Sequence, residues 1–227
     1  MSDLEKQKSF LQDFVAKHKV MEKSVELFNS SPDLKIIPDK FGKVPRNYLS
    51  RSKQMIELVK GEVQKVINDY KYGKEKFEGV IYCMFKKTES DDLVPLYIGK
   101  AEKYGKTGNL SENITLGKGK FARWGHGYAY HIGDLSAVAY NHAKAKKPKK
   151  YADWANALFA EYPAKPTGDI ILKEKIYFWM QAWESGSIGL WKQFGPTSLT
   201  FLEYQLIGVA TSIYPYQVLN KEGHNRG

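Results

Sequence analysis

The sequence predicts an α+β protein in which helices flank a small three-stranded sheet of antiparallel type. Two apolar strings on either side of a polar break at residues 88–92 have the composition of a β-hairpin. A third string, at residues 175–183, is rich in aromatic residues and predicts another strand. Apolar residues at helical spacing before and after these strings supply the flanking helices. The order strand, strand, helices, strand and helix is typical of a compact α+β domain.

The segment before the hairpin predicts a helical arm. Ser2 and Glu5 fit a capping box, and apolar residues then recur at helical spacing as far as Phe28. Further helices are expected over residues 47–70, 151–161 and 198–211. The expected organisation is an arm at residues 1–76 and a main domain at residues 77–227, with inserts at about 102–120 and 141–170.

The hairpin brings two tyrosines to one face. If it closes symmetrically about the centre of the polar break, Tyr82 pairs with Gly99 and Met84 pairs with Tyr97. Side chains on a strand alternate between faces, and directly paired residues share a face. We therefore expect both tyrosines on the same side of the sheet, with the glycine opposite Tyr82 leaving room for a phosphate.

The composition indicates a partner that carries negative charge. The 227 residues include 42% hydrophobic residues, enough to form a core, and the formal net charge is +10. Nucleic acid is the commonest partner of such proteins, because its affinity for them comes largely from neutralised phosphates. A basic protein without such a ligand is the alternative that charge alone leaves open.

The single cysteine and the absence of long apolar segments narrow the setting. One cysteine, Cys83, excludes an intramolecular disulfide and a cysteine-rich zinc module, and its apolar neighbours indicate a small core residue. The charged start of the sequence has no apolar region of a secretory signal, and no apolar stretch is long enough to span a membrane. We therefore expect a cytoplasmic protein with no membrane partner.

The hairpin also carries two short motifs of a known enzyme family. Residues 79–82 read GVIY and residues 97–101 read YIGKA, and the pair resembles the motifs that name the GIY-YIG nuclease superfamily. The resemblance covers roughly residues 78–223 and leaves the arm outside. It implies a metal-dependent endonuclease that hydrolyses phosphodiester bonds in DNA, either a stand-alone restriction-type enzyme or a defence nuclease of a phage or mobile element.

The resemblance implies a set of catalytic residues. In this sequence they are Tyr82, Tyr97, Lys100, Arg123, His126 and Glu203. Arg123 would hold the scissile phosphate through two hydrogen bonds. The position one helical turn after this arginine belongs to His126 or Tyr128, because the fourth residue on is Gly127.

Tyr82 would orient or deprotonate the attacking water. A free phenol has a pKa near 10, so Tyr82 needs nearby positive charge in order to act as a base. Lys100 and Arg123 are the expected sources of that charge, and Lys100 could also contact phosphate or help to polarise the water.

Glu203 is the expected metal ligand. It lies on the last expected helix among apolar residues, where a carboxylate is costly unless it is paired or bound to a metal. One carboxylate with water and substrate oxygens suits Mg²⁺, and Mn²⁺ is the alternative cofactor. The other interpretation is that Glu203 lies on an exposed edge of the helix. Gly99, Tyr128 and Asn220 have supporting roles in the implied site.

Lysine-rich segments are expected to contact the nucleic-acid backbone. The candidates are Lys118, Lys120, Lys146, Lys147, Lys149 and Lys150. Such contacts position a duplex without reading its sequence, although a solvated face is the usual explanation of a lysine run.

Duplex DNA is the expected partner. Cutting both strands with one site per chain would need either a homodimer or sequential nicking. A non-catalytic nucleic-acid-binding protein on a fold derived from the same superfamily is the alternative function. A basic interaction protein whose aromatic residues only form a core is a third.

Overall fold

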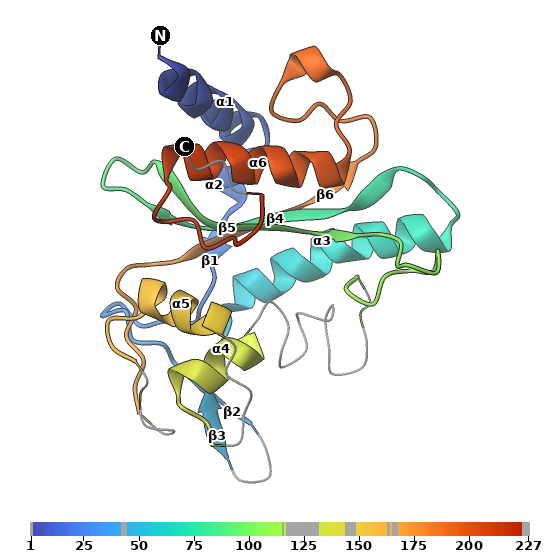
Figure 1. Ribbon diagram of the computed structural model, residues 1–227. Coiled ribbons are helices and arrows are strands. Elements are labelled where there is room, and N and C mark those ends of the chain that lie inside the picture. Colours follow the sequence, from blue (N-terminus) through green and yellow to red (C-terminus); the bar gives the residue numbers. More distant parts are fainter. Residues whose placement is uncertain are drawn as a thin grey trace.

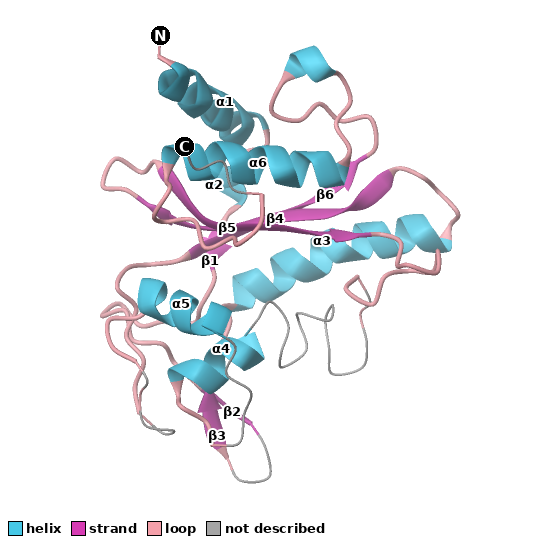
Figure 2. Cartoon of the chain, viewed as in Figure 1, coloured by secondary structure: helices cyan, strands magenta, loops and turns pink. Residues whose placement is uncertain are grey.

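A computed structural model gives the arrangement of most of the chain (Figure 1). The described residues are 2–41, 45–114, 116, 132–143, 149–162, 164 and 168–223. They form a central β-sheet with helices on both of its faces (Figure 2). The prediction of an α+β fold is therefore confirmed.

The main sheet has four antiparallel strands in the order β1-β6-β4-β5. The strands are β1 (Val25–Glu26), β4 (Phe77–Lys87), β5 (Leu93–Glu102) and β6 (Tyr177–Glu184). The sequence predicts the last three. The fourth, β1, comes from the segment expected to be helical, so the expectation of three strands is wrong by one short edge strand.

The helical arm is interrupted at Lys19. The first helix, α1 (Asp3–Lys17), begins with the expected capping box, and the short α2 (Val20–Lys23) follows Lys19, whose backbone is left-handed at φ 52°. The chain is extended from Ser24, and Val25 then pairs with Phe178 of β6. A β-branched residue suits this edge position, so the helix does not continue to Phe28.

A small ribbon precedes the next helix. Strands β2 (Asp39–Phe41) and β3 (Arg46–Tyr48) pair with each other in a separate two-stranded sheet. Helix α3 (Lys53–Lys71) starts later than the expected residue 47, because the side chain of Ser52 accepts a hydrogen bond from the backbone N–H of Met55 at 2.9 Å. Ser52 is thus the N-cap that fixes where the helix begins.

The remaining helices complete two layers around the sheet. They are α4 (Ile132–Ala139), α5 (Lys149–Leu158), the short 3₁₀ helix η2 (Lys192–Phe194) and α6 (Leu199–Ile213). Helices α1 and α6 lie on one face, and α3, α4 and α5 lie on the other (Figure 1).

Alternation along β4 divides the core between these layers. Ile81 and Cys83 belong to the cluster under α1 and α6, whereas Val80, Tyr82 and Met84 belong to the cluster on the opposite face. Cys83 is buried there, as its apolar neighbours predict. Residues 2–76 thus contribute a helix to each face and a strand to the sheet. The domain boundary at residue 77 stays a prediction from the sequence.

Candidate active site

The hairpin sets the two motif tyrosines side by side. Tyr82 pairs with Gly99, and Met84 pairs with Tyr97, which confirms the predicted register. The ring centroids of Tyr82 and Tyr97 are 6.4 Å apart. Beyond Met84 a bulge shifts the register, so that Phe85 pairs with Pro95. The register shift lies next to Pro95, which has no backbone N–H to donate to the hydrogen-bond ladder.

Gly99 makes room for Tyr82 itself. A β-carbon added at Gly99 would lie 2.5 Å from the Tyr82 hydroxyl oxygen and 2.6 Å from the ring carbon that bears it. The phenol therefore crosses directly over the glycine. The expectation that this glycine leaves space for a phosphate is wrong, because the Tyr82 ring occupies that space.

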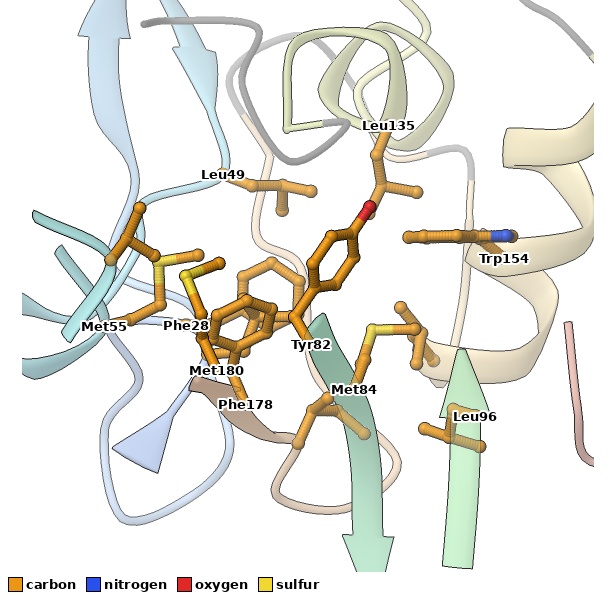
Figure 3. Packing of buried hydrophobic residues seen from close by; sticks show 14 of the residues in the cluster. Phe28, Leu49, Met55, Tyr82, Met84, Leu96, Leu135, Trp154, Phe178 and Met180 are labelled. Carbon is orange, nitrogen blue, oxygen red and sulfur yellow. The ribbon is translucent and has the colours of Figure 1, made fainter. Parts of the chain in front are cut away.

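Tyr82 is enclosed by the helices on its face of the sheet. Its side chain is only 7% exposed. Figure 3 shows the phenol rising from β4 with its oxygen directed toward Leu135 of α4 and with Trp154 of α5 beside it. Phe178 of β6 lies next to the ring, with the two centroids 6.0 Å apart. Tyr82 is therefore a residue of the hydrophobic core as well as a member of the candidate active site.

This burial raises the pKa of both tyrosines. It raises the pKa of Tyr82 well above 10, and the negative charges that Tyr97, Glu203 and Tyr151 can carry raise it further. Burial also raises the pKa of Tyr97 to about 12, with Glu203 and Glu222 adding to the effect. The described surroundings therefore disfavour the phenolate form of Tyr82 still further than in a free tyrosine. They do not support the expectation that it acts as a base.

The outer edge of β5 is held by the C-terminal segment. Asn220 accepts a hydrogen bond from the N–H of Ile98 at 3.0 Å and donates one to the carbonyl of Ile98 at 2.8 Å. One residue earlier, the N–H of Leu219 donates to the carbonyl of Leu96 at 2.7 Å. Asn220 thus completes the pairing of an edge strand that would otherwise end in solvent. Asn220 therefore supports the strand that carries the second motif.

Glu203 lies at the same edge, beside the second motif. Its half-buried carboxylate accepts a hydrogen bond from the backbone N–H of Lys100. Burial raises the pKa of Glu203, the N–H and ammonium of Lys100 lower it, and the charges of Glu102 and Glu222 raise it. Helix α6 thus brings Glu203 to Lys100, which lies 103 residues earlier in the chain.

Lys100 is turned toward another carboxylate. Its ammonium pairs with Glu102 at 2.6 Å, and Thr200 of α6 donates to the same carboxylate oxygen at 2.7 Å. Lys100 therefore contributes to the charge around Glu203 while its ammonium is engaged by Glu102. Contact of this ammonium with phosphate stays a prediction.

Lys150 lies closer to the tyrosines than its place in a lysine-rich run suggests. Its ammonium is 4.9 Å from the ring centroid of Tyr97 and 5.4 Å from that of Trp154. Lys149, by contrast, is exposed. The sequence holds one signal for this position, since Lys150 and Trp154 are four residues apart and share a helix face.

Seven other expected site residues fall in segments that the structure does not describe. Those that lie outside the described residues are Arg123, His126, Tyr128, Lys118, Lys120, Lys146 and Lys147. Within the described part of the chain, no three His, Cys, Asp or Glu side chains form a group that could hold a metal ion. Among the described residues, a metal site at Glu203 would therefore contain at most two such side chains.

Two further findings bear on function. Over the described ranges, no helix combines the length and the apolar character needed to cross a membrane. Comparison of this chain with models of protein families, with curated proteins and with solved structures gave no match.

Proposed function

We propose that the protein is a metal-dependent endonuclease that hydrolyses phosphodiester bonds in DNA, in the manner that its resemblance to GIY-YIG nucleases implies. One observation supports this above the others. The hairpin register sets Tyr82 beside Tyr97, and α6 brings Glu203 to the backbone of Lys100 in the second motif. Residues separated by more than a hundred positions thus converge on the two motifs.

The carboxylate of Glu203 fits a divalent cation. Burial and the neighbouring Glu102 and Glu222 disfavour its negative charge, and a cation would offset both effects. Glu203 is accordingly the residue that would hold Mg²⁺ or Mn²⁺. Such an ion supplies Lewis acidity to a phosphate oxygen and stabilises the negative charge of a leaving group.

The tyrosines would act as neutral groups. Tyr97 is only partly buried, so its hydroxyl is the better placed of the two to donate a hydrogen bond to a phosphate oxygen. Tyr82, behind it, would orient water or fix the position of Tyr97. Arg123 would bind the scissile phosphate, as the resemblance implies.

Cleavage of plasmid DNA with and without Mg²⁺ tests the proposal. Wild-type protein should nick or linearise the plasmid, and EDTA should abolish this. Glu203→Gln keeps the size of the side chain and an oxygen for the Lys100 N–H, but removes the charge that a cation needs. We expect it to lower the cleavage rate by about a hundredfold or more while duplex affinity changes by less than about tenfold.

The matched control is Glu57→Gln, which removes an exposed carboxylate from α3. It should cleave at the wild-type rate. Cleavage that persists in excess EDTA, or full activity of Glu203→Gln, would contradict the assignment. Tight duplex binding by the wild type without any cleavage would favour the non-catalytic alternative.

A further inference from the structure

The ammonium of Lys150 is held among aromatic rings at the candidate site. Lys150 lies in the first turn of α5, and its nitrogen is 4.9 Å from the ring centroid of Tyr97, 5.4 Å from that of Trp154 and 5.7 Å from that of Tyr151. The faces of aromatic rings attract cations at such distances. The rings therefore fix the position of the charge, next to one of the two motif tyrosines.

This cation has no carboxylate partner among the described residues, and in that respect it differs from other lysines that are partly or fully buried. Each of the following lysines forms an ion pair: Lys35 with Asp169, Lys86 with Glu174, Lys100 with Glu102, and Lys103 with Asp69. Over the described ranges no carboxylate lies within ion-pair distance of the Lys150 nitrogen, although Glu222 is near enough to favour its charge.

Leaving such a charge without an anion is unfavourable. Burial and the neighbouring charge of Lys221 lower the pKa of Lys150, and Glu222 only partly opposes them. A half-buried ammonium therefore gains from an anion more than an exposed one does, because less water solvates it. A phosphate oxygen beside Tyr97, which is partly exposed, would be such an anion.

We propose that Lys150 binds a backbone phosphate of the nucleic acid at the Tyr97 side of the site, and so contacts the substrate within the catalytic centre. The inference rests on the proposed nuclease function for its effect on rate. It separates Lys150 from its exposed neighbour Lys149, which has no such ring contact within the described part of the chain. A fixed cation stabilises the charge that develops on a phosphate better than a mobile one, because it need not reorganise.

Two variants of Lys150 and one matched control test its effect on rate. Lys150→Met removes the charge and keeps an unbranched side chain against the rings, and Lys150→Arg keeps a cation that stacks on them. Lys149→Met removes the same charge one residue away. With saturating duplex and Mg²⁺, we expect the single-turnover rate of Lys150→Met to be about a hundredfold below that of Lys149→Met. Lys150→Arg should recover most of the difference.

Thermal unfolding curves should first show that both Met variants are folded. Equal cleavage rates for the Met variants at positions 150 and 149 would then show that Lys150 only packs against the rings, and would overturn the proposal. A rate defect that Lys150→Arg does not reduce would overturn the role of the cation in the same way.

A second measurement does not depend on cleavage or on the folding of Lys150→Met. Wild-type lysines are dimethylated with ¹³C-formaldehyde, and the NMR signal of Lys150 is assigned by its loss in Lys150→Arg. Adding a short duplex in EDTA should shift that signal and raise the pKa of this amine. An unchanged Lys150 signal, at duplex concentrations that shift other lysines, would overturn the proposal. A shifted signal in a protein that never cleaves DNA would refute the nuclease function and keep the phosphate contact.

Discussion

Replacing Gly99 with alanine should destabilise the protein through one defined clash. The added β-carbon would lie 2.5 Å from the Tyr82 hydroxyl oxygen, 2.6 Å from the ring carbon that bears it, and 2.8 Å from another ring carbon. Gly99 has no positive φ, so alanine meets no backbone penalty there. The destabilisation therefore arises from the contact with Tyr82, and it is opposed by the gain of about 0.5 to 1 kcal/mol that alanine brings in place of a strand glycine.

The magnitude follows from how firmly Tyr82 is held. Its ring is 7% exposed and is enclosed by groups from α4, α5 and β6, so it cannot swing aside without displacing core side chains (Figure 3). Overpacking of this kind costs about 2 kcal/mol. For a protein of this size, that corresponds to a Tm lower by about 4 to 8 °C.

A double-mutant cycle in urea, followed by tryptophan fluorescence, measures the clash directly. Tyr82→Leu is destabilising alone, because it leaves a cavity, but it also removes the outer ring atoms that meet the new methyl group. The loss of unfolding free energy in the double variant should therefore be smaller than the sum of the losses in the two single variants, by about 1 kcal/mol or more.

Gly61→Ala is the matched control, since Gly61 is an exposed helical glycine with nothing within 4 Å of an added β-carbon. It should raise stability by about 0.5 to 1 kcal/mol. Wild-type stability of Gly99→Ala, or strict additivity in the cycle, would show that the phenol does not cross the glycine.

Two further predictions concern the elements around the site. Burial, helped by the charge of Lys17, lowers the pKa of His18 from 6.5 to about 4. As the pH falls, His18 is therefore protonated in the unfolded chain before it is protonated in the folded protein. The free energy of unfolding should fall by about 2 to 3 kcal/mol between pH 6.5 and pH 4. Urea unfolding across this range checks the slope, and His18→Leu should flatten it; an equal slope in the variant would assign the effect elsewhere. Asn220→Leu removes both hydrogen bonds to Ile98 and should lower the unfolding free energy by about 2 kcal/mol. The control Gln217→Ala, at an exposed residue, should change the unfolding free energy by less than about 0.5 kcal/mol. Equal effects of the two variants would mean that the edge of β5 does not depend on Asn220.

Features of this fold that depend on local pattern could be predicted from the amino-acid sequence. A strand alternates with a period of two residues, and a short turn fixes which residues can pair. The register of Tyr82 with Gly99, and of Met84 with Tyr97, could therefore be derived from the hairpin alone. The capping box at Ser2 is confirmed for the same reason, since a cap involves only neighbouring residues.

The elements that cover the hairpin and complete its edge are set by contacts between distant segments, and local pattern did not predict them. Val25 lies in a helical pattern, yet it forms an edge strand because β6, about 150 residues away, offers a free backbone to pair with. The burial of Tyr82 arises from α4 and α5, which follow it by fifty residues or more, and no periodicity within β4 specifies their packing (Figure 3). That packing raises the pKa of the phenol, because a pKa responds to desolvation by whatever lies nearby.

The same distinction separates Lys150 from Lys149. Both belong to one lysine-rich run, and composition assigns them the same role. The fold directs one toward Tyr97 and leaves the other exposed, since successive residues of a helix point in different directions. The chemistry-bearing residue types are thus set by the sequence. Their burial, their charge and their partners are set by contacts between segments that are distant along the chain.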